Sequence, residues 1–298
     1  MDTETIAVLL SEATLSLYPI LIKNVNTDLA TQLFFRLGTY SSLTGVLADT
    51  KDITATWGSL PAVLSNLAYG LMNLIHIGSS YIGFANLPAG TAMALFYTYP
   101  LLNILAGVLF LGESFDFVLL PFFAVAILGV YLLSQKDEKD VQEGLGVADG
   151  VDGVNGVKKK SSWALGLAAI AISALTETLI FIVAKIAPTT SNALYPMLQL
   201  YVGAFFILCG GLIGMKKMPD WSASVPLIFF NVFIGFVGYL MRFYAIPLLP
   251  TSIFSILSFI GVVTAYGWGN LFAYETPSLK AMIGAALVTG SIGAGNTV

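Results

Sequence analysis

Residues 87–113 read Leu-Pro-Ala-Gly-Thr-Ala-Met-Ala-Leu-Phe-Tyr-Thr-Tyr-Pro-Leu-Leu-Asn-Ile-Leu-Ala-Gly-Val-Leu-Phe-Leu-Gly-Glu, a long apolar run that ends in a charge. A membrane helix needs about 20 predominantly apolar residues, and this run meets that length. Residues 249–275 repeat the pattern: Leu-Pro opens both stretches and Gly-x-Leu-Phe-x-x-Glu closes both, at a constant offset of 162 residues. An offset shared over a whole span predicts an internal repeat.

The whole chain has the composition of a membrane protein. Its 298 residues are 57% hydrophobic and 10% charged, with a mean hydropathy of +0.85. Soluble domains carry about 25% charged residues, so a soluble enzyme, a disordered chain and a nucleic-acid binder are excluded. The net charge of −4 offers no basic patch, and the single cysteine, Cys209, cannot form an internal disulfide.

Apolar runs separated by short polar connections predict ten membrane helices. We expect them at residues 5–23, 28–48, 61–83, 89–111, 117–134, 164–185, 193–215, 225–246, 249–272 and 278–296. A polar, Gly- and Asp-rich flexible loop at 135–162 separates the two halves, 1–134 and 163–298. Five helices per half is an odd number, so the second half must enter the membrane from the opposite side. We therefore predict an all-α integral membrane fold of two inverted five-helix repeats, an architecture common among secondary transporters.

Residues 87–113 resemble the fourth helix of EamA-like repeats, a family in the drug/metabolite transporter (DMT) superfamily, which carries a mid-span proline (here Pro100) and ends in Gly-Glu. Residues 283–290 resemble the small-residue helix that closes such a repeat, and Arg36 lies where these repeats often place an arginine. The second copy departs from the pattern, because Val262 replaces the proline and Tyr274 the glycine. The resemblance covers nearly the whole chain and implies a multi-pass transporter with one EamA-like unit in each half, without naming a substrate.

Ionisable groups within membrane spans are costly and usually functional. The candidates are Glu12, Arg36, His76, Glu177 and Arg242. Glu12 and Glu177 lie at similar depths on helices related by the repeat, so we expect them to act as cation or proton sites, with Arg36 as an anion contact. The alternative is a pair of structural ion pairs, Glu12–Arg36 and Glu177–Arg242. Arg242 lies near a helix end, where snorkelling to the interface is the favoured interpretation.

The third expected helix carries a stripe of polar residues on one face, spaced three and four apart: Asn66, Tyr69, Asn73, His76 and Ser80. Such a stripe must face a watery cavity or another helix, and its length favours a cavity. Tyr99 and Asn103 share a face of the fourth helix. The predicted substrate site therefore comprises Glu12, Arg36, Asn73, His76, Tyr99, Asn103, Glu177 and Arg242.

We predict a secondary transporter of a small polar metabolite that works by alternating access, with or without proton coupling. Acids together with arginines favour an amino acid or an amine; nucleotide sugars and sugar phosphates are the alternative within the superfamily, and a passive channel or a membrane scaffold is the alternative from another class. No catalytic constellation, cofactor motif or metal-ligand spacing is present in the sequence, so we expect no enzyme.

The expected partners are the substrate and the lipid bilayer, not nucleic acid, with monomer and homodimer both open. Most lysines outside the spans lie on the side of the membrane opposite the two termini, which the positive-inside rule assigns to the cytosol. The resemblance implies instead that the termini are cytosolic, so the orientation stays open.

Overall fold

The structure, a computed structural model, describes residues 2–25, 27–87, 89–134, 162–187, 192–273 and 278–295. Every regular element in these ranges is a helix, so the predicted all-α class is confirmed for them. The loop predicted at 135–162 falls outside the described residues except for Ser162, as do Pro88, Tyr274 and Glu275 of the repeat.

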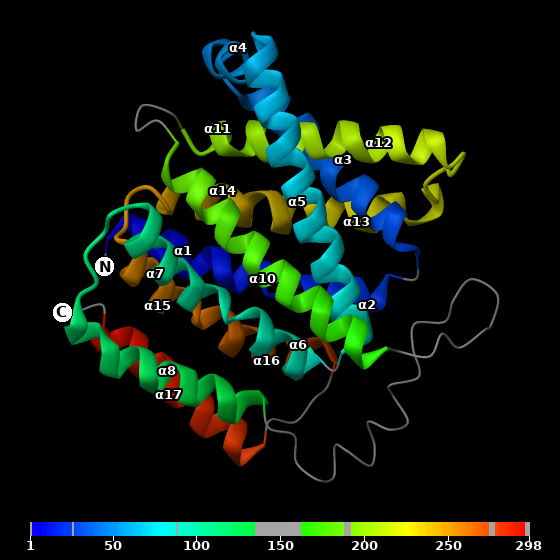
Figure 1. The fold of residues 1–298 in the computed structure, drawn as a ribbon. Coiled ribbons are helices and arrows are strands. Elements are labelled where there is room, and N and C mark those ends of the chain that lie inside the picture. The colour runs from blue at the N-terminus through cyan, green and yellow to red at the C-terminus, as the bar shows by residue number, and fades with distance from the viewer. Residues whose placement is uncertain are drawn as a thin grey trace.

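Within each half of the chain, the helices follow one another with short connections (Figure 1). Their bounds are α1 (Thr3–Leu15), α2 (Tyr18–Asn24), α3 (Leu29–Leu47), α4 (Thr50–Trp57), α5 (Leu60–Asn86), α6 (Ala89–Phe96), α7 (Tyr99–Phe110), η1 (Phe117–Leu119), α8 (Leu120–Ser134), α10 (Trp163–Lys185), α11 (Leu194–Met197), η2 (Leu198–Val202), α12 (Gly203–Gly214), η3 (Trp221–Ala223), α13 (Ser224–Phe230), η4 (Asn231–Phe236), α14 (Val237–Ala245), α15 (Thr251–Ser258), α16 (Ile260–Ala273) and α17 (Leu279–Gly295).

Six of these helices or runs of helices are long and apolar enough to cross a membrane. They are Thr3–Ile22, Leu60–Asn86, Trp163–Lys185, Leu194–Gly214, Trp221–Ala245 and Thr251–Phe272. Shorter apolar helices occupy Tyr99–Phe110, Phe117–Leu132 and Met282–Gly295. Helix α4 was not expected, because eight residues of mixed polarity resemble a connection; the Asn66 side-chain amide donates to the Thr56 carbonyl and ties α4 to α5.

Two of the expected spans are broken at positions related by the repeat. Helix α6 gives way to α7 at Tyr97-Thr98, just before Pro100, and α15 gives way to α16 at Phe259. Proline lacks an amide hydrogen and clashes with the preceding turn, which accounts for the first break. In the second, a Cβ on Gly261 would lie 1.7 Å from the Tyr97 hydroxyl, so the glycine lets the two broken segments approach closely.

The helices pack in pairs that join the two halves of the chain. The most extensive contacts are α5 with α10, α8 with α17, and α1 with α14; α3 crosses η2 and α12, and α7 packs on α15. Figure 1 shows α8 and α17 side by side along one edge of the bundle and α5 beside α10 nearer the middle. The segments α1, α3, α5, α7, α10 and α14 thus surround a common interior, where the ionisable side chains gather.

Candidate substrate and ion site

Arg242 joins two carboxylates that come from different halves of the chain. Its Nη1 donates to Glu12 Oε1 on α1, and its Nη2 donates to Glu177 Oε1 on α10. All three side chains are at least 95% buried. The expected snorkelling of Arg242 is therefore wrong: its helix packs along α1, so the side chain meets acids in the interior instead of reaching the interface.

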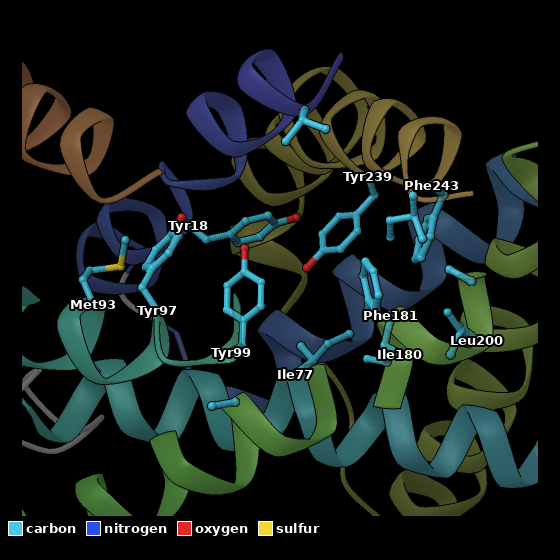
Figure 2. Close-up of a cluster of buried hydrophobic side chains, with 14 of the residues drawn as sticks. Tyr18, Ile77, Met93, Tyr97, Tyr99, Ile180, Phe181, Leu200, Tyr239 and Phe243 are labelled. Carbon is cyan, nitrogen blue, oxygen red and sulfur yellow. The ribbon is translucent and has the colours of Figure 1, made fainter. Parts of the chain in front are cut away.

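Two tyrosines complete the shell of Glu12. The Tyr97 hydroxyl donates to Glu12 Oε2 and the Tyr99 hydroxyl to Glu12 Oε1, each at 3.2 Å. Figure 2 shows both rings rising from their segment toward α1. Both Glu12 oxygens thus accept hydrogen bonds from N–H or O–H groups, which is how a buried carboxylate is compensated.

His76, the single histidine of the chain, lies against the second acid. Its Nε2 is 3.1 Å from Glu177 Oε2, and its Nδ1 is 3.1 Å from the Ser173 carbonyl oxygen. Both residues are nearly inaccessible to solvent. Each acid therefore faces a basic residue on the helix that packs against it from the other half: Glu12 faces Arg242, and Glu177 faces His76.

Arg36 occupies a cage of tyrosines instead of an ion pair. Its guanidinium carbon is 4.1 Å from the centroid of the Tyr18 ring and between 5.3 and 5.8 Å from those of Tyr239, Tyr81 and Tyr40. Its Nη2 donates to the Tyr239 hydroxyl at 2.9 Å. The buried Nε has no hydrogen-bond partner, and among the described residues no carboxylate pairs with Arg36. The alternative ion pair between Glu12 and Arg36 is therefore wrong.

No pattern in the sequence indicates this tyrosine cage. Its four tyrosines come from α2, α3, α5 and α14, and each alone reads as an ordinary aromatic core residue. They are held by one another, since the Tyr18 and Tyr40 hydroxyls are 2.5 Å apart and Tyr18 donates to Asn231 Oδ1 at 2.7 Å. A search for polar side chains in apolar runs does not find tyrosines.

A small cavity separates Arg36 from the acids. Its volume is about 60 Å³, and Glu12, Glu177, His76, Arg36 and Arg242 all line it. A water molecule needs roughly 10–15 Å³ of such volume, so the space suffices for a few waters and not for a metabolite.

Three predicted site residues do not line this cavity: Tyr99, which still donates to Glu12 beside it, Asn73 and Asn103. Asn73 donates to the Leu200 carbonyl at 3.1 Å, so this part of the polar stripe faces η2 and not a cavity. The stripe divides because α5 packs closely on α12 at Gly70, leaving only His76 and Ser80 on the cavity wall. Asn103 is fully buried in α7 with neither side-chain atom hydrogen-bonded and does not line the cavity.

A second charged cluster ties the halves together at one end of the bundle. Lys185 Nζ is 3.4 Å from Glu113 Oε1 and also donates to the carbonyls of Ile246 and Leu249. Glu113 Oε2 accepts the amide of Thr251 at 2.9 Å, at the start of α15. Glu113 ends the segment that repeats at an offset of 162 residues, and its contact with Thr251 joins the end of the fourth expected span to the start of the ninth.

An all-helical bundle with membrane-length apolar helices and a buried cluster of charges defines the chain as a multi-pass membrane protein. Residues 3–135 match the model of the EamA-like transporter family, and this region belongs to that family, which is part of the DMT superfamily. This match agrees, over the first half of the chain, with the resemblance that the sequence shows.

Comparison of structures supports the fold over the whole chain. Among 28 solved chains that match, one described only as "Crystal structure of protein" superposes with a TM-score of 0.66. It shares 16% sequence identity and covers 99% of this chain and 95% of its own. At this identity the likeness shows the fold alone. No curated protein matches the chain.

Proposed function

We propose that the chain is a secondary transporter of ten helices, arranged as two inverted five-helix repeats (1–134 and 163–298), that moves a small polar metabolite by alternating access. An amino acid or an amine is the favoured substrate, and the transport is coupled to protons. The observation that carries the proposal is the bridge by which Arg242 joins Glu12 and Glu177, one acid from each half, beside the central cavity.

The pattern of helix contacts supports the repeat. In an inverted repeat, each of the first five spans corresponds to the span five places later, so α1 corresponds to α10 and α5 to α14. Exchanging the halves therefore turns the contact of α1 with α14 into the contact of α10 with α5, and both contacts are present. The pairs α3 with η2 and α12, α7 with α15, and α8 with α17 each join a span to its own counterpart. The contacts of α5 with α12 and of α7 with α10 also have exchanged counterparts, in α3 with α13 and in α1 with α15 and α16. A pseudo-two-fold exchange thus preserves these contacts, and the charged cluster lies where the halves meet, as in transporters built from inverted repeats.

The charges around the cavity support a zwitterionic substrate. Arg36 has a free, buried Nε donor and no acidic partner, so a substrate carboxylate would supply the missing counter-charge. On the other side of the same cavity, Glu12 and Glu177 share a single guanidinium. A substrate ammonium would compete with Arg242 for these oxygens, and release of Arg242 would loosen the contact between the halves.

A binding screen on the purified protein tests the proposal. We expect thermal stabilisation by amino acids or amines, because a ligand at about 100 times its dissociation constant stabilises the folded state by about 2.7 kcal/mol. The stabilisation should be lost in Glu12→Gln and in Arg36→Leu and kept in Lys217→Gln, whose exposed ion pair with Asp28 lies outside the cavity. Stabilisation only by nucleotide sugars or sugar phosphates would contradict the proposed substrate class and assign the site to an anion held by Arg36.

Transport in proteoliposomes tests the mechanism. An alternating-access carrier gives saturable uptake and accelerated exchange when unlabelled substrate is inside the vesicle. Flux that never saturates would indicate a channel. The scaffold alternative predicts two results together: the protein shows no flux, and its function in cells survives replacement of both Glu12 and Glu177 by glutamine.

A further inference from the structure

We infer that His76 and Glu177 hold one exchangeable proton between them, and that this pair, not Glu12, is the proton-binding site of the molecule. The assignment of the proton rests on the short distance between His76 Nε2 and Glu177 Oε2 and on the acceptor-only carbonyl beside Nδ1. The role of the pair as the coupling site rests in addition on the proposed transport function, and the experiment below separates the two.

The first step concerns the hydrogen on Nδ1 of His76. This atom lies 3.1 Å from the Ser173 carbonyl oxygen, which accepts hydrogen bonds and cannot donate them. Two hydroxyls are also near, Thr176 Oγ1 at 3.3 Å and Ser173 Oγ at 3.4 Å. Each already has a backbone acceptor for its one hydrogen: Thr176 donates to Ile172 at 2.7 Å, and Ser173 to the His76 carbonyl at 3.5 Å. Nδ1 is therefore the donor.

The second step follows for Nε2. In a neutral imidazole whose Nδ1 carries the hydrogen, Nε2 presents a lone pair. This lone pair would face Glu177 Oε2 at 3.1 Å, and an ionised carboxylate oxygen is also only an acceptor. Two acceptors at this distance in a buried site repel each other. One additional proton, on Nε2 or on Oε2, turns the repulsion into attraction.

The hydrogen-bond donors around the two acids explain why the proton is placed on the pair of Glu177 with His76 and not on Glu12. Glu12 receives donors on both oxygens, from Tyr97, Tyr99 and Arg242. Glu177 receives Arg242 on Oε1, while its buried Oε2 accepts no well-formed hydrogen bond and has only the histidine beside it. Donors thus occupy both oxygens of Glu12, whereas Glu177 leaves one oxygen free to share a proton.

The proton sets the charge of the whole site. The charged and titratable groups around the pair come from every segment that lines the cavity: Glu12, Tyr18, Arg36, Tyr81, Tyr97, Tyr99, Tyr239 and Arg242. With both acids ionised and His76 neutral, the two arginines balance the two carboxylates. One proton on the pair makes the cluster positive by one unit, so substrate affinity and proton occupancy are linked.

Because His76 is the only histidine, nitrogen NMR of protein labelled with ¹⁵N-histidine and carrying no histidine tag reports on this pair alone. The probe is the proton itself, varied from about pH 5 to about pH 9, the range in which histidine sites titrate. We expect Nδ1 to carry hydrogen in the acidic part of this range and the Nε2 signal to change through a single transition. A neutral ring with its hydrogen on Nε2 and no change with pH would overturn the proposal.

Two variants assign the transition. Glu177→Gln removes the acid and should abolish the transition, whereas Glu12→Gln should retain it, displaced in pH by the lost charge. Loss of the transition in Glu12→Gln with retention in Glu177→Gln would also overturn the assignment. The wild-type spectrum decides on its own, so a variant that does not fold leaves the test intact.

Transport separates the proton site from the proposed function. In proteoliposomes loaded with a pH-sensitive dye, an added mixture of amino acids should move protons in the wild type. His76→Gln should lose the proton movement and flatten the pH dependence of amino acid uptake, which a merely structural histidine would not do, whereas Lys217→Gln, whose exposed ion pair with Asp28 lies outside the cavity, should keep both. A pH-dependent histidine spectrum in a protein that moves no solute would keep the proton pair and contradict the transporter.

Discussion

Arg242 balances two carboxylates at once, so its loss would leave both buried and unpaired. Removing one partner of a buried ion pair typically costs about 3–5 kcal/mol, because the remaining charge stays desolvated. We therefore expect Arg242→Leu to lower the melting temperature of the detergent-solubilised protein strongly. The triple variant with Glu12→Gln and Glu177→Gln should recover most of that loss, since no unpaired charge remains.

An exposed ion pair in the same chain provides the control for this prediction. Lys217 Nζ lies 3.1 Å from Asp28 Oδ1, and the two side chains are 44% and 38% exposed. Exposed pairs are worth about 0–1 kcal/mol, so Lys217→Gln should barely move the melting temperature. Equal losses in Arg242→Leu and Lys217→Gln would contradict the buried bridge.

Single residues differ in how far the sequence reveals them. Glu12, Glu177, His76 and Arg242 are visible because a charge within an apolar run is rare. The pair of Glu177 with Arg242 was one alternative from the sequence, but nothing there showed that Arg242 also turns inward to Glu12. The tyrosine cage of Arg36 leaves no sequence signal, because its members come from four separate segments and tyrosine is common in apolar helices.

At the scale of elements, α5 and α12 touch through backbone. A Cβ at Gly70 would lie 2.4 Å from the Ala204 nitrogen, so Gly70→Ala must push the helices apart. Overpacking of this kind costs about 1–3 kcal/mol, which thermal unfolding should detect. Gly78 lies on the same helix with nothing within 4 Å of an added Cβ. Gly78→Ala should leave stability unchanged or raise it, and a loss equal to that of Gly70→Ala would contradict the close approach.

The start of α3 gives a dependence on pH. Asp28 caps the helix by accepting the Thr31 amide at 3.0 Å. Partial burial alone would raise the pKa of Asp28, but the Thr31 amide and the Lys217 ammonium outweigh it and hold the pKa below its ordinary value. An acid with a lowered pKa stabilises the fold above its ordinary pKa, and that contribution is lost as the pH falls through the lowered one.

Asp28→Asn keeps a capping oxygen and removes the charge. We expect wild type to be the more stable protein at neutral pH and the difference to vanish on acidification. Denaturation at several pH values measures this. A stability difference that stays constant with pH would show that the charge of Asp28 contributes nothing.

Elements were predicted well where hydropathy alone decides. Apolar runs place a helix at each expected span, and Pro100 marks the break at Tyr97-Thr98. The break at Phe259 has no proline, so only the offset to the first copy hints at it. Helix α4 was missed because its stability comes from α5, through the Asn66 bond to Thr56, and not from a pattern of its own.

At the scale of the whole molecule, the halves are joined at the central bridge and again at one end, where Glu113 accepts the Thr251 amide and faces Lys185. A carboxylate at a helix start is also favoured by the helix dipole. This contact spans the fourth, sixth and ninth expected spans, so it restrains how the halves can move. Opening of the cavity toward this end would have to break it.

Hydrogen exchange followed by mass spectrometry tests that restraint. Glu113→Ala removes the acceptor of the Thr251 amide and the partner of Lys185, so peptides covering residues 246–255 should exchange faster. Asp116→Ala is the matched control: it lies on the same connection and caps only its own turn, through Val118. It should change exchange locally and leave 246–255 as in wild type. If Glu113→Ala left those peptides equally protected, the end contact would not restrain the halves, and helix packing and the central bridge would account for the restraint.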